Sequence, residues 1–119
     1  MFEITLVVVP PGGGEAEYNL PMRVPALPRE GDYVSVMRKR DLQAFGPDFG
    51  TEDFIVRRVW WTFDYPDDGA LYHYAGEGPV GELACAIGVE CEMAKAYYSS
   101  ERHAKAAGPN AKTFEASAY

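Results

Sequence analysis

The chain has 119 residues, 47% of them hydrophobic and 24% charged, a composition typical of one folded domain and not of a disordered chain. Its net charge of −7 argues against direct binding of nucleic acid or of anionic membranes, because the average surface repels phosphate. The same charge would suit an inhibitor or decoy that occupies a basic groove on another protein, although it also serves simply to keep a small protein soluble.

The segment 2–8 alternates apolar and polar residues, which predicts a half-buried strand. It is too short to cross a membrane, and Glu3 lies where a signal peptide carries positive charge. With Cys85 and Cys91 as the two cysteines, we expect a cytoplasmic protein with free thiols. The Pro-Pro-Gly-Gly-Gly run at 10–14 predicts a loop, since the helix start and lysine of a phosphate-binding loop do not follow it.

Two more strands are expected before residue 40. Residues 17–24 predict a second strand, which Pro21 confines to a sheet edge or a bulge because proline lacks a backbone donor. Gly31 permits a tight turn, after which residues 33–37 predict a short strand with its two valines on one face.

Residues 54–65 are apolar on both faces, which predicts a central strand that is strongly coiled or bulged. Strict alternation would place Ile55, Val59, Trp61, Phe63 and Tyr65 on one face and Phe54, Val56 and Trp60 on the other.

The segment 83–93 decides the fold class. Its Ala and Glu residues favour a helix by propensity, but its apolar residues occupy every second position. These positions form one face only on a strand, so we predict a strand, with a bend at Gly88. A short helix follows, capped by Ser99 or Ser100 and ended by the Gly-Pro pair at 108–109.

These elements predict a mainly β fold: a small, strongly bent antiparallel barrel with five or six strands and one short C-terminal helix. Residues 1–109 are expected to form a single domain and residues 110–119 a loosely ordered tail, in which Phe114 and Tyr119 are the residues able to dock. The stretches LPREGDYVSV, FIVRRVWW and LACAIGVECEM resemble small SH3-like β-barrel proteins of bacteria and their phages, many without assigned activity. The resemblance implies a fold and no catalytic residue.

An aromatic hairpin is expected around the turn signal Pro-Asp-Asp-Gly at 66–69, which would place Phe63 opposite Tyr72 and Trp61 opposite Tyr74. We interpret the inner rings as a wall of the core, and the rings nearest the turn as an exposed platform for a planar ligand, a partner or a second copy. The candidate binding residues are Tyr65, Tyr72, Tyr74, Trp60, Arg57 and Arg58.

The sequence predicts no catalytic residue, metal or cofactor. His73 would lie diagonal to Asp64, which could orient its ring for general-base work, but no third group is placed beside them. Cys85 and Cys91 would stand roughly 20 Å apart along a strand, too far for a disulfide or a shared metal. A small hydrolase using His73 and Asp64 is therefore an alternative, and an ordinary surface pair is the preferred interpretation.

Basic residues near the strands offer a site for a small anion or a nucleotide phosphate, although salt bridges are the preferred interpretation. We therefore expect a non-enzymatic binding or interaction module that self-associates or binds a protein partner, with an acidic phage-type inhibitor as the alternative. The basic residues are Arg38, Lys39, Arg40, Arg57 and Arg58, and their expected acidic partners are Asp41, Glu52 and Asp53.

Overall fold

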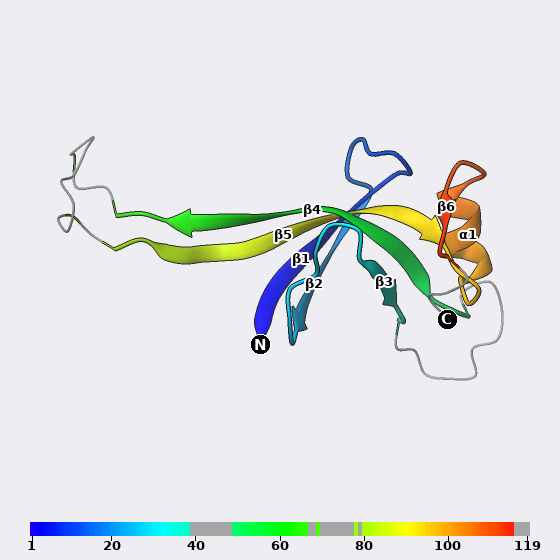
Figure 1. The fold of residues 1–119 in the computed structure, drawn as a ribbon, viewed down its shortest axis with the longest axis horizontal. Coiled ribbons are helices and arrows are strands. Elements are labelled where there is room, and N and C mark those ends of the chain that lie inside the picture. Colours follow the sequence, from blue (N-terminus) through cyan, green and yellow to red (C-terminus); the bar gives the residue numbers. More distant parts are fainter. Residues whose placement is uncertain (39–48, 67–68, 70–77, 79, 116–119) are drawn as a thin grey trace.

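The computed structural model (Figure 1) describes residues 1–38, 49–66, 69, 78 and 80–115, and only the backbone for residues 82–86. The elements in chain order are β1 (Phe2–Val9), β2 (Tyr18–Val24), β3 (Tyr33–Val36), β4 (Glu52–Asp64), β5 (Glu82–Lys95), α1 (Glu101–Ala107) and β6 (Lys112–Thr113). The predicted mainly β fold with one short late helix is confirmed.

All six strands belong to one sheet in the order β2-β1-β5-β4-β3, with β6 beside β5 and off this path. The predicted edge position of the second strand is confirmed, and its Pro21 lies opposite Thr5. The prediction of a purely antiparallel sheet is wrong, because β1 and β6 both run parallel to β5. In the β1–β5 pair Leu6 lies opposite Val89, so the apolar faces of both strands enter one core.

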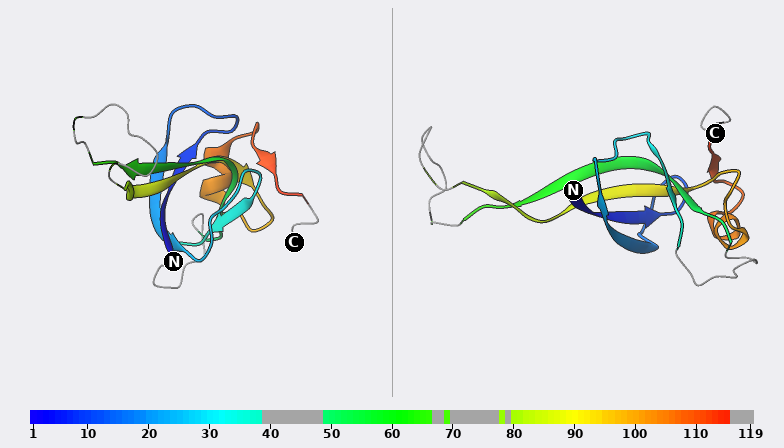
Figure 2. Two further views of the ribbon diagram at one scale, coloured as in Figure 1. Left: turned by 60° about the vertical axis from the view of Figure 1, so that its left-hand side comes forward. Right: turned by 90° about the horizontal axis from the view of Figure 1, so that it is seen from below.

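The sheet is strongly bent (Figure 2), and one of its faces holds the core. Tyr18 of β2 reaches across this face, where its hydroxyl donates to Glu52 of β4 at 2.7 Å and its ring meets Phe54 edge-on. Between the edge strands β2 and β3, the described part of the chain has no strand pairing, so the sheet is open there. The buried residues of this core are Ile4, Leu6, Val8, Phe54, Val56, Ile87, Val89, Cys91, Met93 and Ala107.

The long β4–β5 pair contains two irregularities, one between Trp61 and Phe63 and one at Arg57, where β4 has one residue more than β5 between Val56 and Arg58. An extra residue reverses the alternation of side chains. Val59 consequently packs on the same core as Val56, and Trp60 turns to the other face. The predicted bulge is confirmed, but the expected separation of Val56 from Val59 and Trp61 is wrong.

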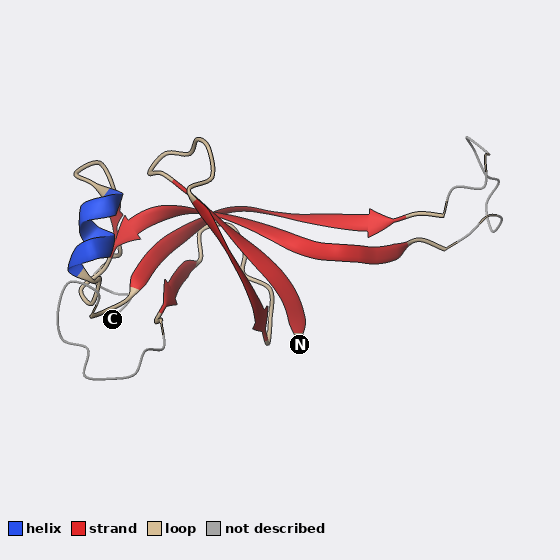
Figure 3. Ribbon diagram, turned by 180° about the vertical axis from the view of Figure 1, so that it is seen from behind, coloured by secondary structure: helices blue, strands red, loops and turns tan. Residues whose placement is uncertain are grey.

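Beyond the sheet body, β4 and β5 continue as a two-stranded ribbon that extends away from the other elements (Figures 1 and 3). We call residues 60–66 and 80–87 of this ribbon the arm. It accounts for the elongated shape, 59 × 31 × 27 Å. Trp61 lies opposite Ile87 in the arm, which confirms that the double-tryptophan segment and the alternating segment are neighbouring strands.

The predicted tight hairpin register is wrong. Phe63 lies opposite Leu83 and not opposite Tyr72, because β4 pairs with β5, which is longer and more apolar than the segment directly after the turn signal. Tyr72, His73 and Tyr74 lie outside the described residues.

Helix α1 begins and ends as predicted. The side chain of Ser100 accepts a hydrogen bond from the backbone N–H of His103, and Gly108 follows the last turn with a φ of 81°. In the segment expected to be a tail, Phe114 docks, as the sequence allowed. Phe114 is buried and stacks on Tyr33 with ring centroids 4.3 Å apart, and its N–H donates to the carbonyl of Lys95.

Candidate binding surface

The arm carries four exposed aromatic side chains. The exposed fractions are 40% for Trp60, 47% for Trp61, 61% for Phe63 and 57% for Tyr65. The interpretation of the inner rings as core wall is wrong for Trp61 and Phe63, because both are exposed and the pairing of β1 with β5 reaches only as far as Ile87, where the arm begins. Together these rings expose on the order of 400 Å², divided between two faces because Trp60 points away from Trp61, and exposed apolar area of this size is often functional.

Trp61 and Phe63 form the centre of this surface. Their rings are nearly parallel, with an interplanar angle of 6° and centroids 6.2 Å apart. They stand two residues apart on one strand, so both project to the same face. The pair gives the arm a flat apolar face that is already ordered before anything binds, which lowers the entropic cost of binding.

Two glycines on the β5 side of the arm lie directly against the rings of Trp60 and Tyr65. A Cβ at Gly88 would lie 2.2 Å from the indole of Trp60, and a Cβ at Gly81 would lie 2.9 Å from the ring of Tyr65. Each ring therefore lies against bare backbone, a known way to cover glycine in a sheet. Gly88, where we predicted a bend, lies in regular pairing opposite Trp60 and Thr5.

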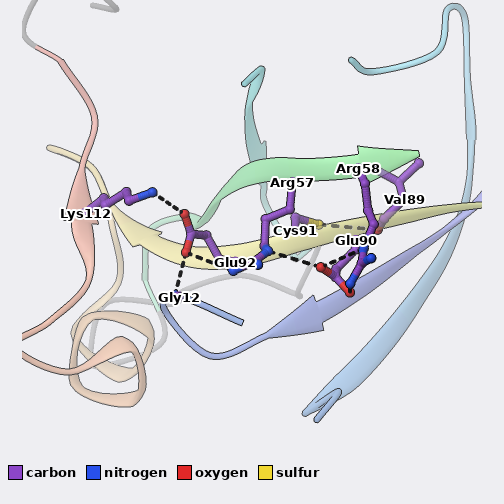
Figure 4. A network of polar contacts seen from close by, with 8 residues as sticks. All are labelled: Gly12, Arg57, Arg58, Val89, Glu90, Cys91, Glu92 and Lys112. Atoms are coloured by element: carbon purple, nitrogen blue, oxygen red, sulfur yellow. Dashed lines mark hydrogen bonds and ion pairs between the residues drawn. The ribbon is translucent and has the colours of Figure 1, made fainter. Parts of the chain in front are cut away.

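The two arginines beside the arm are held by glutamates of β5 (Figure 4). Arg58 donates twice to Glu90, at 3.2 Å each, and the Nε of Arg57 lies 3.1 Å from the same carboxylate. The salt-bridge interpretation is thus right in kind, but the partners are Glu90 and, for Arg57, also Glu92. An expected ion pair does form elsewhere, between Arg38 and Glu52 at 2.6 Å.

Glu92 anchors the glycine-rich loop. Its carboxylate accepts the N–H of Gly12 at 2.6 Å and lies 2.9 Å from the Nζ of Lys112, while Arg57 approaches it at 3.9 Å (Figure 4). Burial raises the pKa of Glu92, but these three partners outweigh burial and lower its pKa below the ordinary value. A protein carboxylate thus uses the loop N–H, which supports a structural role for the loop and not a phosphate site.

A hollow of about 260 Å³ lies between α1 and the open side of the sheet, with Tyr18, Arg38, Glu52 and His103 in its lining. Burial and then the hydrogen bond to Glu52 raise the pKa of Tyr18, and the hydrogen bond to Glu52 raises the pKa of Arg38. Because Tyr18 and Arg38 both bond Glu52, these groups satisfy one another and do not require a ligand.

A buried carboxylate that sequence reasoning missed lies at the β3 end of the sheet. Asp53 is fully buried and accepts hydrogen bonds from Ser35 at 2.5 Å, Thr51 at 2.8 Å and Ser99 at 2.5 Å. The imidazole Nε2 of His103 lies 2.7 Å from the carbonyl of Ala94 and meets only the backbone of Asp53, so the group is not a catalytic triad. The three hydroxyl donors come from segments far apart in the sequence, so no local motif indicated this site.

The alternative sites receive little support. Asp64 is exposed on the arm, and its expected partner His73 lies outside the described residues. Cys91 is a buried free thiol, and burial followed by the charge of Glu90 raises its pKa to about 12; the side chain of Cys85 is not described. In the described ranges no group of three or more His, Cys, Asp or Glu side chains is arranged to hold a metal.

None of the helices in the described part of the chain is long and apolar enough to cross a membrane. The chain matches no protein-family model, and neither a curated protein nor a solved structure matches it. The resemblance to SH3-like barrels therefore stays a prediction.

Proposed function

We propose that the protein is a non-enzymatic binding module that presents the arm to another protein surface. The exposed, stacked Trp61–Phe63 pair is the observation that carries this proposal. Tryptophan and other aromatic residues are enriched at the energetic centres of interfaces, because a rigid ring buries much area for little lost freedom. Two such rings held parallel on a projecting ribbon suit that role.

The charges around the arm favour contact through the rings over contact through net charge. Arg57 and Arg58 share Glu90, and Arg57 also approaches Glu92, so two glutamates offset the two arginines at the base of the arm on a protein with a net charge of −7. Binding through the rings should depend weakly on salt, whereas an acidic decoy of a basic groove should lose most of its affinity as salt rises. The salt dependence therefore separates these two functions.

The bent sheet also supports, as a finer proposal, a small SH3-like barrel whose open seam is bridged by side chains. Tyr18 and Arg38 converge there on Glu52 from the two edges of the opening. In this proposal the barrel is a rigid base, and the arm is the functional insertion.

The test replaces Trp61 and Phe63 by Ser in one variant and Tyr97 and Tyr98 by Ser in a control. The control residues are also an exposed aromatic pair, in edge contact and remote from the arm. Immobilised protein should capture partners from an extract of its source cells, or itself, and only the arm variant should lose them. Equal capture by both variants, with unchanged mass in solution, would count against the proposal.

A further inference from the structure

We infer that the occupant of the arm is a second copy of this chain, paired antiparallel along the outer edge of β4 in a register centred on Trp61. The inference rests on the proposed function, because it uses the same arm. Pairing of β3 with β4 ends at Ile55, and Val56 exchanges its backbone hydrogen bonds with Gly31 and Asp32. Past that point the described residues supply no strand to this edge, and unpaired strand edges are templates for further strands.

The register follows from the charges on β4. In a two-fold antiparallel pair of strands, opposed residues lie equally far on either side of the centre and share a face. A centre at Trp61 places Arg58 of each copy opposite Asp64 of the other. Centres at neighbouring positions place Asp64 opposite Trp60 or the buried Val56, so Trp61 is the centre that gives an ion pair.

Asp64 would gain a cationic neighbour in this register. Its position within the arm is opposite Glu82, so its own ladder offers an acidic residue and not a cation. It has no ion pair among the described residues, whereas the side chain of Arg58, which pairs with Glu90 in its own copy, is still 68% exposed. Opposed charges on paired strands stabilise the pair, and like charges destabilise it. The second copy would supply the missing cation twice across one two-fold axis.

The same register matches the apolar residues. Val59 would lie opposite Phe63 of the other copy, and Trp61 opposite its own counterpart. A shallow hollow of about 380 Å³ borders Val59 and Trp61 and is completed by Leu27 and Pro28, which offers space for the incoming Phe63 ring. The β4–β5 register shifts between Trp61 and Phe63, but β5 holds the two extra residues there, and the nearly parallel Trp61 and Phe63 rings fit regular alternation on β4.

Size and charge also fit a second copy. Ring surface on the order of 400 Å² per copy is about half of one side of a standard interface, so strand hydrogen bonds must contribute and a micromolar dimer is expected. The arm projects from the body, so antiparallel arms place the two acidic bodies at opposite ends of the ribbon (Figure 3). Their separation would exceed the screening length of about 8 Å at physiological salt, which limits repulsion.

Sedimentation equilibrium of the full chain between about 10 and 500 µM tests the inference. Wild type should approach twice 13.2 kDa. Asp64→Arg and Arg58→Glu should each be monomeric, because each opposes like charges twice. An equimolar mixture of these two variants should regain the dimer mass, because both cross-pairs are then opposite in sign. Glu15→Arg, an exposed site away from the arm with the same charge change, should dimerise like wild type.

Three outcomes would overturn the inference: a wild type that stays monomeric at 500 µM, single variants that still dimerise, or a mixture that stays monomeric. Circular dichroism melts of each variant establish that it is folded. A monomeric wild type that still captures partners through Trp61 and Phe63 would overturn the second copy as occupant and leave the proposed function standing. A wild type that neither dimerises nor captures partners would overturn both the inference and the proposed function.

Discussion

The indole of Trp60 occupies the space above Gly88 that a side chain would need: a Cβ there would lie 2.2 Å from both Cε2 and Cζ2 of the ring. The two residues are opposed on β4 and β5, on the face away from the core. The indole therefore covers the backbone of β5 at the base of the arm, where the two-stranded ribbon extends beyond the sheet.

Gly88→Ala is expected to destabilise the fold by about 1–3 kcal/mol, because the added methyl displaces the indole. Urea unfolding followed by circular dichroism measures the change. The tryptophan fluorescence maximum should shift to longer wavelength as Trp60 becomes more exposed to water. The control is a double-mutant cycle with Trp60→Ala, in which the methyl meets no ring. The same cost of Gly88→Ala with and without the indole would contradict the explanation.

Asp53→Asn is expected to cost about 1–3 kcal/mol, because the amide replaces one acceptor oxygen with a donor and leaves a buried hydroxyl unmatched. The wild-type carboxylate accepts hydrogen bonds from Ser35, Thr51 and Ser99, which join β3, β4 and the turn before α1. Urea denaturation midpoints measure the loss.

Glu15→Gln is the control for Asp53→Asn, since this carboxylate is exposed and away from the arm, and it should cost less than about 0.5 kcal/mol. A cost for Asp53→Asn as small as that of the control would mean that the buried hydrogen bonds add nothing to stability.

Local signals in the sequence were sufficient for most elements. Alternate apolar residues identified β5 and its Ile87 face, although the helix propensity of its Ala and Glu residues pointed the other way. Ser100 and Gly108 marked the ends of α1, because capping chemistry is contained in a few neighbouring residues. Burial of an alternating face outweighed intrinsic propensity.

Non-local features could not be predicted in the same way. The pattern of β1 is the same whether it pairs parallel or antiparallel, and the strong turn signal after Tyr65 suggested the wrong partner for β4. One extra residue at Arg57 exchanges the faces of everything that follows it, and composition does not reveal where a bulge falls. The hydroxyls around Asp53 are brought together only by the folded sheet.

The thiol of Cys91 is expected to resist modification in the native protein, because burial raises its pKa to about 12 and excludes reagent. In a Cys85→Ser background, where Cys91 is the remaining thiol, a disulfide reagent at pH 8 should react at least about 100-fold more slowly than in denaturant. Fast reaction without denaturant would show that the core opens at this strand.

Glu92→Gln is expected to destabilise the protein at neutral pH and to matter less in acid. The folded protein lowers the pKa of Glu92 from its ordinary value of 4.5, since the Gly12 N–H, Lys112 and Arg57 favour the charged form over the opposing effect of burial. Such a group contributes its full stability above the unfolded pKa and loses it as the pH falls through the lower folded pKa. The difference in free energy of unfolding between wild type and Glu92→Gln should therefore narrow from pH 7 to pH 3.

Urea denaturation midpoints at both pH values measure this difference. The control is Glu3→Gln, which removes an exposed ion pair to Arg23 and should change stability little. A gap of equal size at pH 3 would show that the stability comes from the packing of the side chain and not from its charge.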